Sequence, residues 1–238
     1  MSNLRIALIA EDNTDCEAVR EIVHRVLGEK TQTKKWASNG CNHLRRKLSA
    51  KMMALSNEGC NAFIIVHDLD RNPANGSLND EAKLRTKLEK LMAEFDKIEK
   101  HICIPIEELE AWFWSDPNVI KSIGGQKAKA DPNPQSITKP KEKLIEISKG
   151  ENRKPRYSTN DNVKLAKMLN LELCSRRCSS FKKLLDFLKQ LSEDEIDSDL
   201  LAQAISEHDG SFVSFHNVIE GYNQLHGTNF DEENLVNG

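Results

Sequence analysis

The 238-residue chain lacks the motifs of several large enzyme classes. It has no G-x-x-x-x-G-K-[ST] sequence, because Gly124-Gly-Gln-Lys127 is too short, and no G-x-S-x-G or H-E-x-x-H sequence. ATP hydrolysis by a P-loop and hydrolysis by a serine or zinc enzyme are therefore not indicated. The chain also has no internal repeat and no heptad run, which leaves a globular domain as the class to consider.

Long apolar runs and a cysteine framework are also missing. No stretch approaches the roughly 18 apolar residues of a membrane span, and Glu11 and Asp12 interrupt the first apolar run. We therefore expect a cytoplasmic protein that does not contact a membrane. The six cysteines follow no repeating frame and are expected to be reduced thiols. Cys174 and Cys178 have no matching second Cys/His pair, so no zinc site is expected there.

The length and the charge distribution suggest two parts. A chain of this size can bury one core with a helical annex, and we expect an α/β domain at 1–120 and the annex at 121–238. Residues 121–183 carry sixteen Lys/Arg and six Asp/Glu, whereas residues 184–238 carry one and twelve. The basic part suits phosphates, and the acidic part suits shielding of that surface or binding of a partner. Simple solvated faces are an equally open interpretation.

Strand and helix patterns alternate in the first half. The capping box Thr14-x-x-Glu17 predicts where the first helix begins, and Asp116-Pro117 ends the last one. Strands are expected at 5–10, 31–37, 62–67 and 101–106, and helices at 14–27, 42–55, 81–95 and 107–115. This alternation predicts an α/β fold with a doubly wound, mostly parallel sheet.

The second half shows helical patterns and no convincing strand. Residues 124–138 form a polar loop punctuated by proline and glycine. Helices are expected at 141–148, 162–169, 180–191, 199–205 and 212–225. They predict a helical annex that packs against the sheet.

Acidic residues follow the apolar strands of the first half. Glu11 follows the first strand, and Asp68 and Asp70 follow the strongest one. Ligands of open parallel sheets collect at the carboxyl ends of the strands, so these carboxylates are expected to converge. Crowded carboxylates repel, and a hard cation such as Mg²⁺ relieves that repulsion. The alternative is a polar turn before Pro73.

Acids also follow the next strand. Glu107 and Glu110 lie one turn apart, so at least one of them can complete the cluster, while Glu108 is expected to point elsewhere. The alternative interpretation is that acids simply favour the start of a helix. The same reasoning applies to Asp15, which we expect to act behind the direct metal ligands.

With these residues in place, the first half resembles the Toprim domain of topoisomerases, primases and overcoming-lysogenization-defect (OLD) type nucleases. The resemblance rests on Glu11, Asp15 and the pair Asp68-x-Asp70, with Asp12 standing where the Toprim pattern usually has glycine. Segments 104–112, 139–143 and 179–181 look like a family of uncharacterised bacterial Toprim-like proteins, often encoded beside an ATPase. In that family the recurrent acid lies two residues before the Trp, which favours Glu110 over its neighbours.

The resemblance implies a site and an activity. Topoisomerases add a tyrosine nucleophile and primases a zinc ribbon, but this chain has only Tyr157 and Tyr222 and no such ribbon. A water nucleophile activated by Mg²⁺ or Mn²⁺ remains, which implies a nuclease, plausible as the effector of a bacterial defence module. The implied catalytic and metal-binding residues are Glu11, Asp68, Asp70 and Glu110, with Asp15 as a further metal-site residue.

Other functions and partners were weighed. One alternative is a non-catalytic subunit that docks an ATPase, favoured by Asp12 in the glycine position. A response-regulator receiver fits less well, because a receiver has a single aspartate where this chain has Asp68-x-Asp70. Expected partners are nucleic acid, an ATPase and a second copy of the chain. The residues expected to contact phosphates are Lys139, Lys141, Lys143, Arg153, Lys154 and Arg156.

Overall fold

A computed structural model describes residues 4–72, 74–149 and 153–206 of the chain, with side chains described as far as residue 192. The chain divides into two compact units, residues 4–189 and residues 1–3 with 190–238. The site and its surroundings belong to the unit 4–189. The helix expected at 212–225 and most of the acidic region lie outside the described residues.

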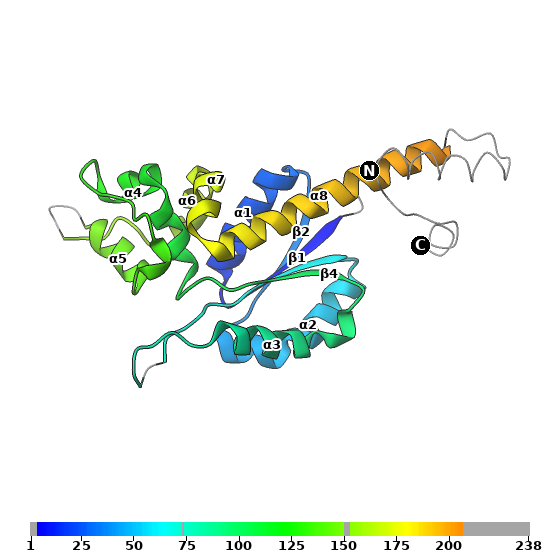
Figure 1. The fold of residues 1–238 in the computed structure, drawn as a ribbon, viewed down its shortest axis with the longest axis horizontal. Coiled ribbons are helices and arrows are strands. Elements are labelled where there is room, and N and C mark those ends of the chain that lie inside the picture. Colours follow the sequence, from blue (N-terminus) through cyan, green and yellow to red (C-terminus); the bar gives the residue numbers. More distant parts are fainter. Residues whose placement is uncertain (1–3, 73, 150–152, 207–238) are drawn as a thin grey trace. The chain divides into compact units, whose positions relative to one another are not determined.

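A parallel sheet of four strands forms the centre of the unit 4–189 (Figure 1). The strand order is β2-β1-β3-β4, and every neighbouring pair is parallel, with Ile9 opposite both Trp36 and Ile65. The carboxyl ends of all four strands therefore lie at one edge. The strands are β1 (Arg5–Ala10), β2 (Gln32–Ala37), β3 (Ala62–Val66) and β4 (Glu99–Cys103). The predicted α/β fold with a parallel sheet is confirmed.

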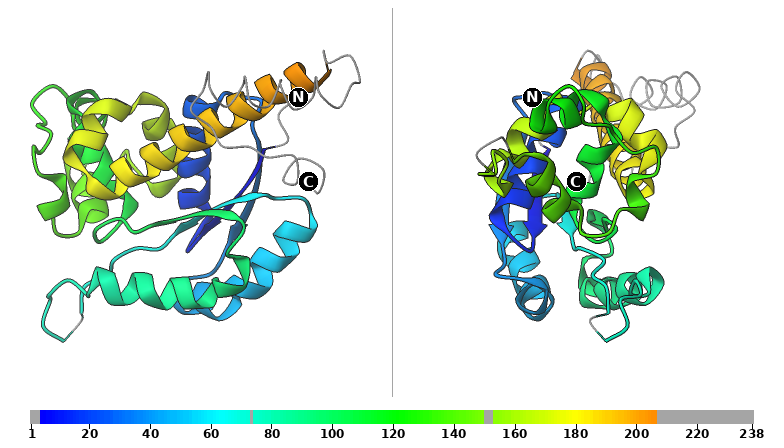
Figure 2. Two further views of the ribbon diagram at one scale, coloured as in Figure 1. Left: turned by 45° about the vertical axis from the view of Figure 1, so that its right-hand side comes forward. Right: turned by 90° about the vertical axis from the view of Figure 1, so that its left-hand side faces the viewer.

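Helices cover both faces of the sheet (Figures 1 and 2). One face carries α2 (Cys41–Asn57) and α3 (Glu81–Leu91). The other carries α1 (Asn13–Leu27) and the start of α8 (Ser179–Ser206), whose Phe187 ring stacks on His101 of β4. A sheet buried on both faces needs apolar side chains on both, and all five residues of β3 are buried.

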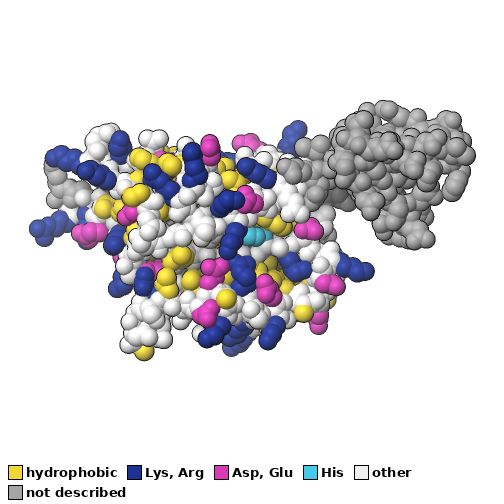
Figure 3. All heavy atoms as spheres, viewed as in Figure 1, with side chains coloured by type: hydrophobic (Ala, Val, Ile, Leu, Met, Phe, Trp, Pro, Cys, Tyr) yellow, Lys and Arg dark blue, Asp and Glu magenta, His cyan; other side chains and the backbone are white. Residues whose placement is uncertain are grey.

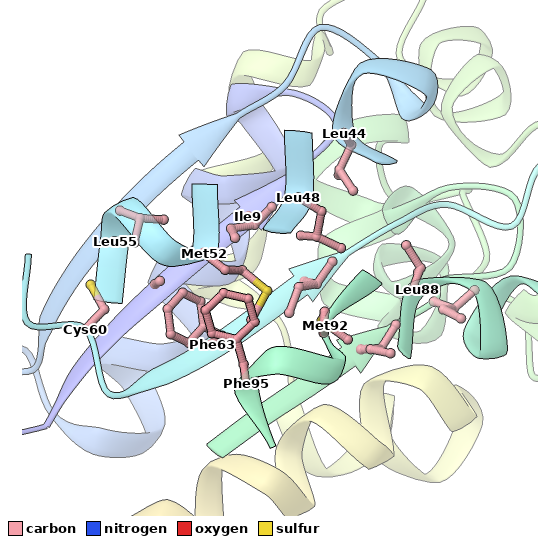
Figure 4. Packing of buried hydrophobic residues seen from close by; sticks show 14 of the residues in the cluster. Ile9, Leu44, Leu48, Met52, Leu55, Cys60, Phe63, Leu88, Met92 and Phe95 are labelled. Carbon is pink, nitrogen blue, oxygen red and sulfur yellow. The ribbon is translucent and has the colours of Figure 1, made fainter. Parts of the chain in front are cut away.

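The core between the sheet and the α2/α3 layer fixes which way the strand-end residues face (Figure 4). Phe63 and Ile65 of β3 contribute to this core, together with Leu48 and Met52 of α2 and Leu88 of α3. Full burial of each such side chain contributes about 1.5–3 kcal/mol. Because side chains alternate along a strand, His67, two residues after Ile65, lies on the side of α2 and α3.

The described residues between 117 and 189 are helical, as expected, and pack on the first half. Its helices are α4 (Pro117–Gly124), α5 (Pro140–Ile147), α6 (Asn162–Met168), α7 (Leu171–Arg177) and α8. The guanidinium of Arg25 in α1 donates to the carbonyl oxygens of Ala166 and Leu169, at 2.6 and 2.8 Å. Residues 4–189 thus form one unit, and the expected division at residue 120 stays a prediction.

Several local predictions were wrong. The first helix is capped by Asp12, whose carboxylate accepts from the N–H groups of Thr14 and Asp15, so Thr14 does not start a capping box. The segment after β4 is a 3₁₀ helix, η2 (Leu109–Ser115), and not an α-helix from Glu107. The pair Asp116-Pro117 ends η2 but also begins the unexpected helix α4, because Asp116 caps it and proline suits the first helical position. The sequence interpretation also missed α7.

All six cysteines are free thiols, in agreement with the sequence interpretation. Among the described residues, no helix has the length and apolar character needed to cross a membrane.

Candidate metal and catalytic site

The carboxyl edge of the sheet brings Glu11 and Asp68 together. Glu11 follows β1 and Asp68 follows the neighbouring strand β3, and the backbone N–H of Asp68 donates to Glu11 Oε1 at 3.2 Å. His67 Nδ1 lies 3.0 Å from the same Glu11 oxygen and 2.9 Å from the carbonyl oxygen of Asp68. Parallel pairing of β1 with β3 therefore places two expected site residues in direct contact.

The charges of Asp15 and Glu110 act on the same cluster as Glu11 and Asp68. Burial, followed by the charges of Asp12, Glu110 and Glu11, raises the pKa of Asp15 to about 8. Burial also raises the pKa of Asp68 well above its usual range, with Asp15, Glu11 and Glu110 adding to the effect. The pKa of Glu11 rises to about 7 through burial and then the charge of Asp70. A pKa raised this far means that the anionic forms are crowded and poorly solvated.

Asp68 carries an oxygen that nothing in the described chain satisfies. Its Oδ1 is buried and has no hydrogen-bond partner. Burying an unpaired carboxylate oxygen costs free energy, and a hard cation or a proton relieves that cost. The donor set, all carboxylate oxygen, is the one that Mg²⁺ and Mn²⁺ prefer.

The side chains are not yet arranged as a ligand set. Among the residues that the structure describes, no three His, Cys, Asp or Glu side chains are placed to hold one metal ion. Glu11 Oε1 accepts two hydrogen bonds, and Asp70 is exposed and lines the adjoining cleft. A cation held here would need Glu11 to give up its contacts with His67 and Asp68.

Glu110 is held by two residues that the sequence interpretation did not assign to the site. Its Oε1 accepts from Asn162 Nδ2 at 3.2 Å and from the Tyr157 hydroxyl at 3.4 Å, and that hydroxyl also lies 2.7 Å from Asn162 Oδ1. Asn162 is fully buried and Glu110 is 3 % exposed. No local motif in the sequence marks partners that lie 47 and 52 positions from Glu110.

Glu107 and Glu108 bond to the start of α5. Their contacts help to decide whether Glu107 or Glu110 completes the acidic cluster. Glu107 pairs with Arg71 and accepts from the backbone N–H of Lys139 at 2.7 Å. Glu108 accepts from the backbone N–H of Lys141 at 3.1 Å and pairs with its Nζ at 2.8 Å. Both therefore anchor the start of α5. The charge of Glu110 acts on both Asp15 and Asp68, and the charge of Glu108 adds a smaller effect on Asp68.

The backbone at Asp12 does not require glycine. Its φ of −137° and ψ of 175° are extended, a conformation that any residue adopts. Its side chain serves as the cap of α1. The replacement of the usual glycine is thus compatible with the same turn.

The expected phosphate-binding residues are mostly exposed. Lys139, Lys143, Arg153, Lys154 and Arg156 lie on the surface and stay candidates. Lys141 differs, because it is half-buried beside the carboxylates. Burial lowers the pKa of Lys141, but the hydrogen bond and charge of Glu108 outweigh that effect and the net pKa is raised.

The fold and the site define an α/β protein with an acidic cluster at the carboxyl edge of a parallel sheet. Residues 10–189 match the family described as a domain of unknown function (DUF4276), and the chain belongs to that family. No curated protein and no solved structure matches it significantly.

Proposed function

We propose that the protein is a nuclease that hydrolyses phosphodiester bonds of nucleic acid with Mg²⁺ or Mn²⁺. The observation that carries the proposal is the buried, partnerless Oδ1 of Asp68 among carboxylates whose pKa values are raised. A structural cluster of acids is normally paired with cations or exposed to water. The cluster in this protein is largely buried. Binding of a metal ion would offset the free-energy cost of burying these carboxylates.

The residues take distinct roles in this proposal. Glu11 and Asp68 hold the cation from adjacent strand ends, and Asp70 reaches it from the open side. Glu110 completes the set in the orientation fixed by Asn162 and Tyr157. The cation, when bound, lowers the pKa of a water molecule and stabilises the charge on the reacting phosphate.

The Toprim-like relationship and the biological setting belong to the same proposal. A Glu after β1 and an Asp-x-Asp after the adjacent strand β3 support it. We further propose an ATPase partner and a role in bacterial defence, as that resemblance implies. The alternative is a non-catalytic docking subunit, which Asp12 in the glycine position favours, although the backbone at Asp12 is extended and does not itself need glycine.

The test removes charge while keeping shape. Asp68→Asn combined with Asp70→Asn is expected to abolish cleavage of supercoiled DNA and structured RNA in Mg²⁺ or Mn²⁺. The assay is run with and without the ATPase proposed to be encoded beside this protein. The matched control is Glu94→Gln with Asp96→Asn, which removes two charges just before β4, at the opposite edge of the sheet. Equal cleavage by the two double variants contradicts the proposal.

A further inference from the structure

A cleft of about 420 Å³ opens beside the carboxylates, between α2 and α3. Asp68 and Asp70 form part of its wall, so it adjoins the proposed metal site directly. Three cationic side chains from two helices also line it: Arg45 of α2, and Lys83 and Lys87 of α3.

Among the described residues these cations have no close carboxylate partner other than Asp80, although the charge of Arg45 acts on Glu11. Arg45 donates to neutral atoms, Asn42 Oδ1 at 2.6 Å and Cys41 Sγ at 3.7 Å. Lys83 has a weak ion pair with Asp80 at 3.6 Å, and both side chains are exposed. No carboxylate in the described part of the chain lies within ion-pair distance of Lys87. This contrasts with Lys141, whose charge is taken by Glu108.

The cationic surface continues outward along α3. Lys83, Lys87 and Lys90 recur at intervals of four and three residues and so share one helix face. A second hollow, about 380 Å³, runs over this face and is also lined by Thr86. Figure 3 shows Lys and Arg side chains over the α3 region with acidic side chains between them.

His67 contributes a buried side chain to the wall of the cleft. It is 1 % exposed and lines the cleft, and its Nδ1 faces two acceptor oxygens, so Nδ1 carries the hydrogen. Nε2 is then a lone-pair acceptor, and it is buried with no partner in the described chain. Because this atom is shielded from solvent, a molecule in the cleft could reach it only after the wall of the cleft rearranges.

We infer that the phosphodiester backbone of the nucleic acid lies in this cleft, held by Arg45, Lys83 and Lys87, and leaves along the Lys83–Lys90 face of α3. The inference rests on the proposed function for the identity of the ligand. It differs from the sequence expectation, which placed the phosphate contacts at 139–156. An extended polyanion fits a row of cations that starts next to the proposed metal site.

The experiment measures binding without cleavage. Fluorescence anisotropy of labelled duplex DNA and of structured RNA is followed across a salt series in EDTA, and again in Ca²⁺. The test variant is Lys83→Gln with Lys87→Gln. The control is Lys30→Gln with Lys97→Gln, two exposed lysines just before β2 and β4, at the amino-terminal edge of the sheet.

The test variant is expected to lower the slope of log K against log salt by about 2, at roughly 0.9 per phosphate contact, and the control to leave it unchanged. Equal slopes for the two variants overturn the inference, even if the acids prove necessary for cleavage. If the wild type cleaves nothing but the slope still depends on Lys83 and Lys87, the nuclease proposal fails and the binding cleft stands. The DNA and RNA series separately show which polymer binds.

Discussion

The raised pKa of Glu11 predicts a specific dependence of stability on pH in the absence of metal. The folded protein binds this proton more tightly than the unfolded chain, so protonated Glu11 stabilises the fold at low pH. That contribution is lost as the pH rises from the usual 4.5 through the folded value of about 7. The full rise corresponds to about 3 kcal/mol, at about 1.4 kcal/mol for each pKa unit. Partial solvent access to Glu11 reduces the expected effect to about 2 kcal/mol.

The assay is urea denaturation in EDTA between about pH 5 and pH 8. His67 and His101 have lowered pKa values and oppose the trend below their usual 6.5, so the wild type is compared with Glu11→Gln, which keeps both histidines. Gln retains the oxygen that accepts from His67 and from the N–H of Asp68. The wild type should lose about 2 kcal/mol relative to this variant over the range. A constant difference between the two proteins refutes the electrostatic description of the site.

Two further predictions concern the residues around the cluster. Asn162→Ala removes a buried group that bonds both Glu110 and Tyr157, and should lower the free energy of unfolding by about 3 kcal/mol in the same denaturation assay; a loss below about 1 kcal/mol contradicts the packing described. Lys141→Gln, Lys143→Gln and Lys154→Gln together should lower the salt slope of DNA binding by about 2 rather than about 3, because Lys141 already neutralises Glu108. An unchanged salt slope in that triple variant would show that residues 139–156 are a solvated surface that does not contact nucleic acid.

The fold was largely predictable because its signals are local. The buried run of β3 and the helical spacing of α2 and α3 appear within single windows of sequence, and they gave the parallel α/β architecture. Element boundaries were less accurate where two signals competed. At the first helix, Asp12 and Thr14 both suit a cap, and the earlier residue is the one used.

The site was predictable only in part, for a physical reason. The proximity of strand-end acids such as Glu11 and Asp68 could be predicted from the sequence, because the carboxyl ends of parallel strands lie at one edge of the sheet. Asn162 and Tyr157 reach Glu110 across about fifty residues, and nothing in their own neighbourhood marks that contact. The α2–α3 cleft was missed because its cations come from two helices that are far apart in the sequence, and only the fold brings Arg45 of α2 to the same cleft as Lys83 and Lys87 of α3.

The anchoring of α5 by Glu107 and Glu108 has a practical consequence for dissecting the molecule. Two adjacent acids hold the start of that helix, and the next acid of the run, Glu110, depends on a buried amide still farther along. A fragment cut after residue 120 would keep every carboxylate of the cluster but lose Tyr157 and Asn162, the two residues that bond to Glu110. The smallest fragment to express is therefore 4–189. We expect no recovery of the proposed cleavage activity on mixing two separate halves, unless the halves are first refolded together.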